Sequence, residues 1–156
     1  MDCDLWFIKN EYFKKYKDQG FMTNKIKSGK TRYRPCFYAI EDINNRNIVW
    51  LVPLSSKERK YKNIYKRIIK KYGHCETLVF GTVLGKKAVF LIQNICPVPK
   101  KYIIPYLDKN NTPIRINGKI SKEVIEKTKY VLKKSRYGVK LTFTNIKELY
   151  KNTNIY

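Results

Sequence analysis

The segment over residues 34–57, RPCFYAIEDINNRNIVWLVPLSSK, constrains the fold more than any other part of the chain. Residues 36–41 and 47–53 are rich in aromatic and β-branched side chains, and the polar sequence INNRN between them is typical of a turn. We therefore expect two antiparallel strands. The second strand should end at Pro53, because proline cannot donate a backbone hydrogen bond to a neighbouring strand.

An amphipathic helix is predicted directly after this segment. Ser55 and Glu58 fit the capping box S-x-x-E, and Gly73 is a typical helix stop. Between them, apolar residues recur at helical spacing, while lysine and arginine occupy the opposite face. A second helix is expected from Ser121 to near Gly138, because its acidic start and basic end agree with the helix dipole.

The remaining segments complete an α+β pattern. They are a strand over 5–8, a short helix over 11–18, a basic loop over 19–34, a hairpin of 76–84 and 87–93, an irregular or edge strand over 95–105, a turn-rich loop over 110–118, and a strand, a helix or both over 140–153. Gly81 indicates a bulge or a close approach of two segments. We expect one domain over residues 1–156, a compact, strongly twisted antiparallel sheet with surrounding helices.

The charge of the chain indicates a polyanionic partner. The sequence has 34 Lys and Arg against 12 Asp and Glu, a net charge of +22. An AT-rich genome raises the lysine content, but it does not exclude acidic residues. Such an excess opposes compaction unless a polyanion neutralises it. The 13 tyrosines and two tryptophans among these cations suit single-stranded nucleic acid better than an anionic membrane surface.

Cysteine spacing and the apolar runs argue against other classes of protein. The four cysteines lie far apart and form no Cys/His cluster, which disfavours zinc and fits a reducing compartment. No apolar run approaches the roughly 20 residues of a membrane span. The acidic, mixed start of the chain does not resemble a signal peptide. We therefore expect a soluble, cytoplasmic protein.

The chemistry open to these residues on RNA is metal-free. His74 is the only histidine, so a paired-histidine mechanism cannot operate within one subunit. Scattered carboxylates disfavour a two-metal nuclease, and no phosphate-binding motif indicates a nucleotide cofactor. Attack by the 2′-hydroxyl of the RNA remains, with cations and hydroxyls holding the phosphate. Ser55, Ser56 and Lys57 offer such groups where a strand meets a helix, although N-capping alone also explains Ser55.

Three blocks of the sequence carry a resemblance to a known family. They are DLWFIKNEYFKKYKD, WLVPLSSK with its Pro-Leu-Ser-Ser motif, and AVFLIQNICPV, which together span roughly residues 4–105. In this order they resemble the type III toxin–antitoxin endoribonucleases of the ToxN/AbiQ family, and the CptN-like members most. The resemblance implies a MazF/Kid-like barrel core and metal-independent cleavage of RNA to 2′,3′-cyclic phosphate and 5′-hydroxyl ends.

The resemblance also implies which residues are catalytic, namely Tyr12, Ser55, Ser56 and Lys57. In the family a proline usually separates the second serine from the lysine, whereas here Lys57 follows Ser56 directly. Arg59 and Lys60 are therefore alternatives for the family lysine.

RNA binding is expected from the 25–34 loop, the cationic face of 57–71 and the basic C-terminal helix. The predicted residues are Lys30, Arg32, Tyr33, Arg34, Arg59, Lys60, Lys62, Lys66, Arg67 and Lys70. The partners that the family implies are mRNA and a small repeat-derived antitoxin RNA, a pseudoknot. In that family, the toxin cuts this RNA from its precursor, is inhibited by it, and assembles with it into a closed, alternating complex. From the residues alone, a non-catalytic RNA-binding protein, such as a ribosome-associated protein or an RNA chaperone, is the alternative.

Overall fold

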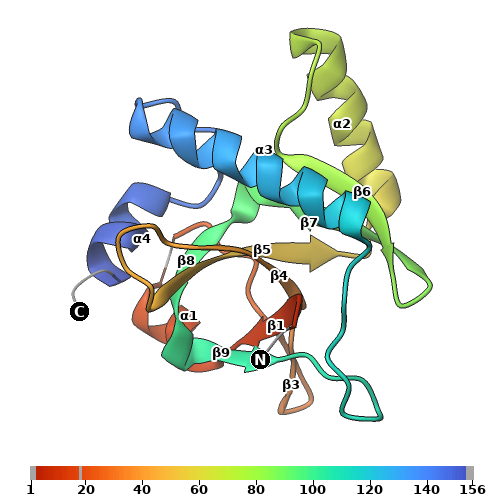
Figure 1. Ribbon diagram of the computed structural model, residues 1–156, viewed down its shortest axis with the longest axis vertical. Coiled ribbons are helices and arrows are strands. Elements are labelled where there is room, and N and C mark those ends of the chain that lie inside the picture. The colour runs from red at the N-terminus through yellow and green to blue at the C-terminus, as the bar shows by residue number, and fades with distance from the viewer. Residues whose placement is uncertain (1–2, 18, 154–156) are drawn as a thin grey trace.

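The structure is a computed structural model that describes residues 3–17 and 19–153 (Figure 1). Its mixed α+β architecture confirms the expected fold class. The helices within these residues are α1 (Asn10–Lys15), α2 (Glu58–Tyr72), α3 (Gly118–Arg136) and α4 (Ile146–Thr153), with the 3₁₀ turns η1 (Ile92–Asn94) and η2 (Lys100–Tyr102). The strands are β1 (Leu5–Ile8), β2 (Lys25–Lys27), β3 (Lys30–Arg32), β4 (Cys36–Glu41), β5 (Ile48–Ser55), β6 (Leu78–Val83), β7 (Lys86–Leu91), β8 (Cys96–Pro99) and β9 (Ile103–Pro105).

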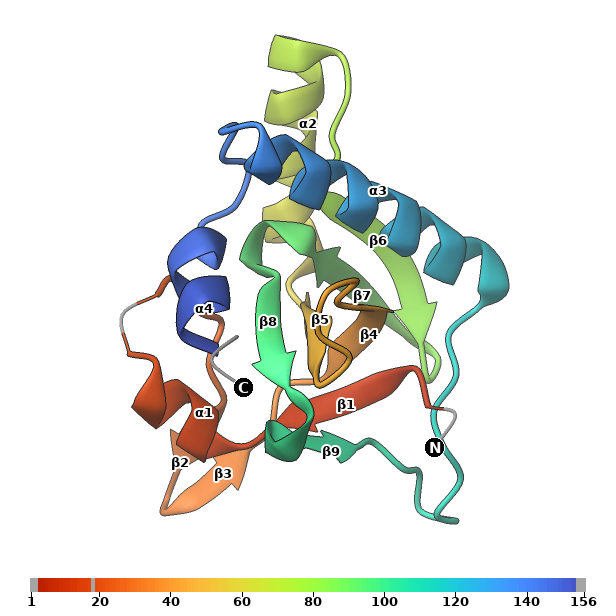
Figure 2. The ribbon, with the colours of Figure 1, turned by 60° about the vertical axis from the view of Figure 1, so that its left-hand side comes forward.

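The main sheet has the order β6-β7-β5-β4-β1-β9, and β8 pairs with β5 outside this path. The pairings among these strands are antiparallel. β1 pairs with β4 on one edge and with β9 on the other, where Trp6 lies opposite Pro105. Segments nearly a hundred residues apart in the sequence therefore lie side by side at the base of the molecule (Figure 2).

β5 is buried on both faces, which explains its nearly unbroken apolar sequence. Its side chains alternate between two parts of the core. Val49 and Leu51 join a cluster that includes side chains of α1 and α4, whereas Val52 and Leu54 join a cluster that includes side chains of α3. The helices therefore cover both faces of the sheet around this strand.

The partner of β5 changes along one of its edges. Ile48 to Leu51 pair with β8, whereas Leu54 and Ser55 pair with β7. β7 and β8 follow one another in the chain, but η1 and Ile95 separate them. Because η1 interrupts the ladder, the β6–β7 hairpin departs from the line of β8.

Helix α2 packs at the hairpin end of the sheet and extends away from the body of the molecule (Figure 1). Tyr61 anchors it in a cluster with Leu78 and Val89. It ends at Gly73, whose φ of 81° is left-handed, as the predicted helix stop requires. Gly81 is a close approach: a Cβ there would lie 2.7 Å from Cδ1 of Ile120 on α3.

Two expectations around β5 are wrong. The strand does not end at Pro53 but continues to Ser55, because the Leu54 N–H donates to the Pro35 carbonyl at 2.9 Å and β7 supplies a new partner. Ser55 is not the N-cap of α2, since Lys57 occupies that position without a side-chain cap.

Other boundaries also differ from those predicted. The expected 19–34 loop contains the β2–β3 hairpin, whose exposed strands lack the apolar alternation that marks a strand in sequence. α3 begins at Gly118, three residues early, because the Asn117 side chain accepts the Lys119 N–H at 2.9 Å. The 140–153 segment forms only the helix α4 within its described residues. None of the helices in the described ranges is long and apolar enough to cross a membrane.

Candidate functional site

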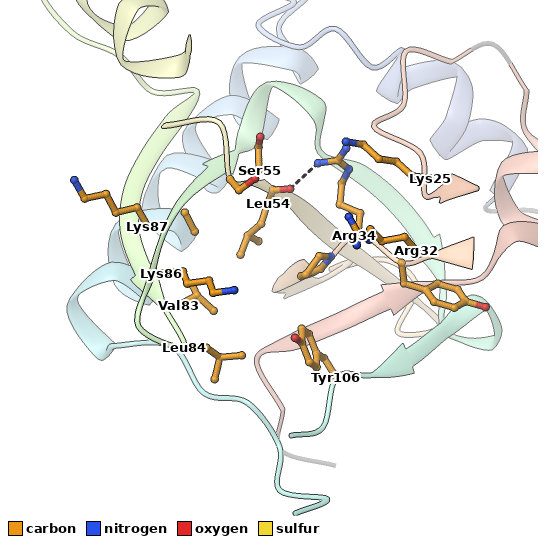
Figure 3. Close-up of a pocket in the computed structure, with 14 residues that line it drawn as sticks. Lys25, Arg32, Arg34, Leu54, Ser55, Val83, Leu84, Lys86, Lys87 and Tyr106 are labelled. Carbon is orange, nitrogen blue, oxygen red and sulfur yellow. Dashed lines mark hydrogen bonds between the residues drawn. The ribbon is translucent and has the colours of Figure 1, made fainter. Parts of the chain in front are cut away.

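A pocket of about 390 Å³ opens at the C-terminal end of β5 (Figure 3). We call it the β5 pocket. The β2–β3 hairpin and the residues after it, the end of β5, the β6–β7 hairpin and one residue after β9 form its walls. The lining residues are Lys25, Arg32, Tyr33, Arg34, Pro35, Leu54, Ser55, Ser56, Val83, Leu84, Lys86, Lys87, Ala88 and Tyr106.

Arg34 joins two of these walls. Its Nη1 donates to the Leu54 carbonyl at 2.8 Å (Figure 3). Its Nε donates to the Thr23 carbonyl at 3.4 Å. Its backbone N–H donates to Oδ1 of Asn24 at 3.0 Å, and the Asn24 side chain in turn donates to the Ile8 carbonyl at 2.7 Å. These bonds hold a guanidinium beside the end of β5 before any ligand binds.

The two serines of the Pro-Leu-Ser-Ser motif both reach the β5 pocket but differ in exposure. Ser55 is 7% exposed, and its Oγ accepts the backbone N–H of Lys57 at 3.2 Å. Ser56 lies beyond the end of the strand and is exposed. Ser55 is therefore fixed by the chain that turns into α2, and the Ser56 hydroxyl is the one open to a ligand.

Cations dominate the polar part of the pocket. The described lining residues include no carboxylate. They include five cations, namely Lys25, Arg32, Arg34, Lys86 and Lys87. The nearby Glu58, in the first turn of α2, lies 3.6 Å from Lys87 and 3.4 Å from Lys62. The cations come from two opposite walls, so an anion between them would meet positive charge from both sides (Figure 3).

The rest of the β5 pocket is apolar and aromatic. Leu84, at the tip of the β6–β7 hairpin, is 61% exposed although it lines the pocket. The rings of Tyr33 and Tyr106 both pack against the ring of Phe7, with centroid distances of 5.5 and 4.5 Å. The pocket therefore places an aromatic surface next to a cationic one, the combination that binds unpaired nucleotides.

The other predicted residues lie outside the β5 pocket. Lys30 is exposed on β3, and Lys57 is exposed at the start of α2. The predicted cations on α2 are exposed along one helix: Arg59, Lys60, Lys62, Lys66, Arg67 and Lys70. This helix starts two residues after Ser56, so its cationic face continues from the edge of the pocket.

Tyr12 does not lie at the site, contrary to what the family resemblance implied. The residue has no exposed surface, and its hydroxyl donates to the Pro97 carbonyl at 2.7 Å. Burial raises the pKa of its phenol well above the ordinary value, and the nearby thiol of Cys96 raises it further. A phenol in these surroundings is a neutral core group and cannot touch RNA, so we do not retain Tyr12 as a catalytic residue.

Sequence reasoning missed several lining residues, namely Lys86, Lys87 and Tyr106, whereas Lys25 lies in the predicted 25–34 loop. Lys86 and Lys87 follow a tight turn in which Leu84 and Gly85 have positive φ, and this turn aims them beside the end of β5. The Leu-Gly-Lys-Lys sequence indicates the turn, but it does not indicate that the turn lies beside the end of β5. Within residues 3–17 and 19–153, no group of three or more His, Cys, Asp or Glu side chains forms a metal site.

The solved structures that share this fold include the following two. One is a protein from work on a processed non-coding RNA that regulates a bacterial antiviral system; its TM-score is 0.69, its identity is 13%, and the match covers 98% of each chain. The other is AbiQ, a lactococcal anti-phage endoribonuclease belonging to the type-III toxin–antitoxin system, with a TM-score of 0.67, 18% identity, and coverage of 98% of this chain and 96% of that one. No protein-family model and no curated protein matches the sequence. The likeness confirms the fold that the sequence resemblance implied.

Proposed function

We propose that this protein is a metal-independent endoribonuclease, the toxin of a type III toxin–antitoxin system. The β5 pocket carries this proposal, because it combines the motif serines with five cations and an aromatic wall. A phosphate is attracted to such a site, and a base next to it can stack. The shared fold with AbiQ, an endoribonuclease, supports the same assignment.

The reaction we propose uses the nucleophile of the substrate. The 2′-oxygen of one ribose attacks the adjacent phosphorus while the bond to the 5′-oxygen breaks, which leaves a 2′,3′-cyclic phosphate and a 5′-hydroxyl. The proton of the 2′-hydroxyl leaves, and one proton is added to the departing oxygen. The protein contributes alignment of the two oxygens and stabilisation of the extra negative charge on the phosphorane.

Five polar residues of the β5 pocket have a defined role in this proposal. Arg34, which is already held by two carbonyls, stabilises the phosphorane oxygens. The exposed Ser56 hydroxyl donates to a non-bridging oxygen, and the buried Ser55 fixes the turn that presents it. Lys86 and Lys87 attract the flanking phosphates from the opposite wall. The donors among the described lining residues suit phosphate, and they include none of the carboxylates that Mg²⁺ prefers.

The same surface supports the partners and the regulation that we propose. The cationic face of α2 and the β2–β3 hairpin extend from the pocket and would contact a longer RNA by its phosphates, so affinity should fall steeply with salt. A small, repeat-derived antitoxin RNA that fills the pocket would block cleavage of mRNA. One protein of the same fold comes from work on an antiviral system that a processed non-coding RNA regulates, which supports an inhibitory RNA here.

The test is incubation of the purified protein with single-stranded RNA in excess EDTA. We expect cleavage to continue and the products to end in 2′,3′-cyclic phosphate. Ser56→Ala should lower kcat by about 100-fold, the typical cost of removing one donor to a developing anion. Ser121→Ala is the matched control, because its hydroxyl lies in α3 and bonds the Ile116 carbonyl. Cleavage that stops in EDTA and returns with Mg²⁺ would contradict the metal-independent mechanism.

A non-catalytic RNA-binding protein is the second candidate. It is favoured by Ser55, whose Oγ already accepts the Lys57 N–H and has a structural role without any reaction. In that case RNA would stay intact, and Ser56→Ala would bind it with unchanged affinity.

Expression in bacteria tests the toxin assignment separately. The wild type should arrest growth, Ser56→Ala should not, and co-expression of tandem-repeat RNA encoded beside the gene should restore growth. A harmless wild type together with a harmful Ser56→Ala would overturn it.

A further inference from the structure

A second pocket, of about 350 Å³, lies between the turn that joins β4 to β5, the C-terminal half of α3 and the start of α4. We call it the α3–α4 pocket, and its lining includes Ile40, Ile43, Trp50, Leu132, Arg136 and Tyr150. It shares no lining residue with the β5 pocket. The β4–β5 turn, the end of α3 and α4 lie on one side of the molecule, away from β3 and the tip of the β6–β7 hairpin (Figure 1).

The floor of this pocket is a fixed aromatic pair. Trp50 and Tyr150 are stacked, with ring centroids 5.9 Å apart and an interplanar angle of 10°. Both donate to the same carboxylate: Trp50 Nε1 to Oδ1 of Asp42 at 3.1 Å, and the Tyr150 hydroxyl to Oδ2 at 2.7 Å. The shared acceptor holds the two rings in place, so the pocket is formed before any ligand binds.

Asp42 does not offer a cation site. Its Oδ2 also accepts the backbone N–H groups of Asn44 and Asn45, each at 3.0 Å. Asp42 is 8% exposed, and both of its carboxylate oxygens already accept hydrogen bonds from donors of the protein itself. The charge that remains open to a ligand therefore comes from the rim.

The rim of the α3–α4 pocket is cationic. Lys129 and Arg136 of α3 and Lys147 of α4 line it, and none of them forms an ion pair within residues 3–17 and 19–153. The walls between them are apolar, and Ile43 is 78% exposed at the mouth. A simple anion would leave these apolar walls unused, and an uncharged apolar ligand would leave the three cations unused.

A nucleotide suits both the apolar walls and the cationic rim of the pocket, because its base is flat and largely apolar on its faces while its phosphate is anionic. We propose that the α3–α4 pocket binds one unpaired nucleotide of an RNA strand, with the base against the apolar walls and the phosphate at the rim. RNA, rather than a free nucleotide, is favoured by the net charge of +22 and by the exposed lysines that continue along α3. This inference rests on the proposed function only in taking RNA as the partner.

The test uses the full chain with Trp6→Phe, which leaves Trp50 as the only tryptophan. The probe is a short oligoadenylate with 2′-O-methyl groups, which cannot be cleaved by its own 2′-hydroxyl. We expect its adenine to quench the Trp50 fluorescence. Reversing the rim charges with Lys129→Glu, Arg136→Glu and Lys147→Glu together should weaken binding by about 10-fold or more.

The matched control reverses three exposed lysines outside both pockets and outside α2 and α3, with Lys14→Glu, Lys17→Glu and Lys109→Glu. An equal loss of binding in this control would overturn the pocket, since only overall charge would then matter. Adenosine monophosphate that binds as tightly as the oligoadenylate would overturn the assignment to RNA. Absence of quenching in a protein that binds the probe would overturn the site.

A gentler variant keeps the test valid if the triple variant does not fold. Ile43→Glu places a carboxylate at the mouth on a side chain that is already 78% exposed, and Val139→Glu, at 46% exposure, is its control. Only Ile43→Glu should abolish quenching. Because the probe cannot be cleaved, this result is separate from that of the cleavage assay, in which the wild type on unmodified RNA tests the proposed function alone.

Discussion

The two ends of β5 carry the same apolar kind of sequence but lie in different surroundings. From Ile48 to Leu51 the strand has neighbours on both edges, β4 and β8, and Tyr12 packs in the core beside them. At Leu54 and Ser55 the neighbour on one edge becomes β7, and the strand ends at the β5 pocket. We call the stretch from Ile48 to Leu51 the closed end, because it lies between β4 and β8 away from the β5 pocket, and we call Leu54 and Ser55, which line that pocket, the open end.

The difference shows that the change of strand partner positions the pocket. η1 lies in the chain between β7 and β8, which pair with successive parts of β5, and the departing β6–β7 hairpin forms a wall of its own. Polar groups near the closed end, such as the Tyr12 hydroxyl, form hydrogen bonds within the core. Groups at the open end, such as Ser56, remain available to a ligand. Changes at the open end should therefore affect cleavage, and changes at the closed end should affect stability.

The largest effect is expected for Arg34→Ala at the open end. It removes a cation from the pocket and the bonds to the Leu54 and Thr23 carbonyls, so cleavage should fall by about 1,000-fold. Arg34→Lys should recover part of the activity, because lysine keeps the charge but cannot reach both carbonyls. Single-turnover cleavage measures both variants, with Arg46→Ala in the β4–β5 turn as the control. Wild-type rates for Arg34→Ala would contradict the role of the open end.

Leu51→Ala should have the largest effect at the closed end. Leu51 has no exposed surface, so its truncation leaves a cavity and should lower the free energy of unfolding by about 3 kcal/mol. Urea denaturation measures this change. At low temperature, where the variant is still folded, its cleavage rate should stay within about twofold of wild type. A larger loss of activity in the folded variant would show that the two ends are coupled.

Tyr12→Phe separates the two ends most directly. It removes the bond to the Pro97 carbonyl and leaves that buried oxygen unpaired, so stability should fall by about 1–2 kcal/mol. Cleavage should not change, because the phenol is buried and neutral. A strong loss of cleavage with unchanged stability would contradict this view, since it would require Tyr12 to reach RNA in another conformation.

The smallest effect is expected for Glu58→Gln at the rim. Its carboxylate lies 3.6 Å from Lys87, whose side chain is 75% exposed. Freeing Lys87 should tighten RNA binding by about two- to fivefold at low salt, and less at high salt. Fluorescence anisotropy with labelled RNA measures the change. Glu123→Gln is the control, because its pair with Lys127 at 3.4 Å lies within α3 and outside the pocket.

Local patterns in the sequence identified much of this architecture. The apolar run of β5, the face of α2 and the stop at Gly73 are local features, and a strand, a helix and a helix end follow from them. The path of β5 beyond Pro53 could not be predicted, because it depends on β7, which lies more than thirty residues later in the chain. The β2–β3 hairpin was missed because its strands are exposed and bury no alternating face.

The candidate site was predictable to the extent that its groups are adjacent in the sequence. Ser55 and Ser56 follow directly from the motif, and Arg34 lies at the start of the same hairpin. Lys86 and Tyr106 reach the pocket only through pairing of distant strands, which leaves no local signal. Tyr12 was predicted as catalytic only from the family resemblance, and its burial depends on contacts with distant residues such as Pro97 that leave no local signal.

The pairing of β1 with β9 also determines when the protein can become active during synthesis. The lining of the β5 pocket begins at Lys25 and ends at Tyr106, and Trp6 lies opposite Pro105. The pocket therefore cannot be complete until about two-thirds of the chain has been made, at roughly 5–20 residues per second. Contacts between such distant residues also close slowly after synthesis. If the β5 pocket cleaves RNA as we propose, a nascent chain is thus inactive for several seconds, an interval in which the proposed antitoxin RNA can accumulate before the first active molecule appears.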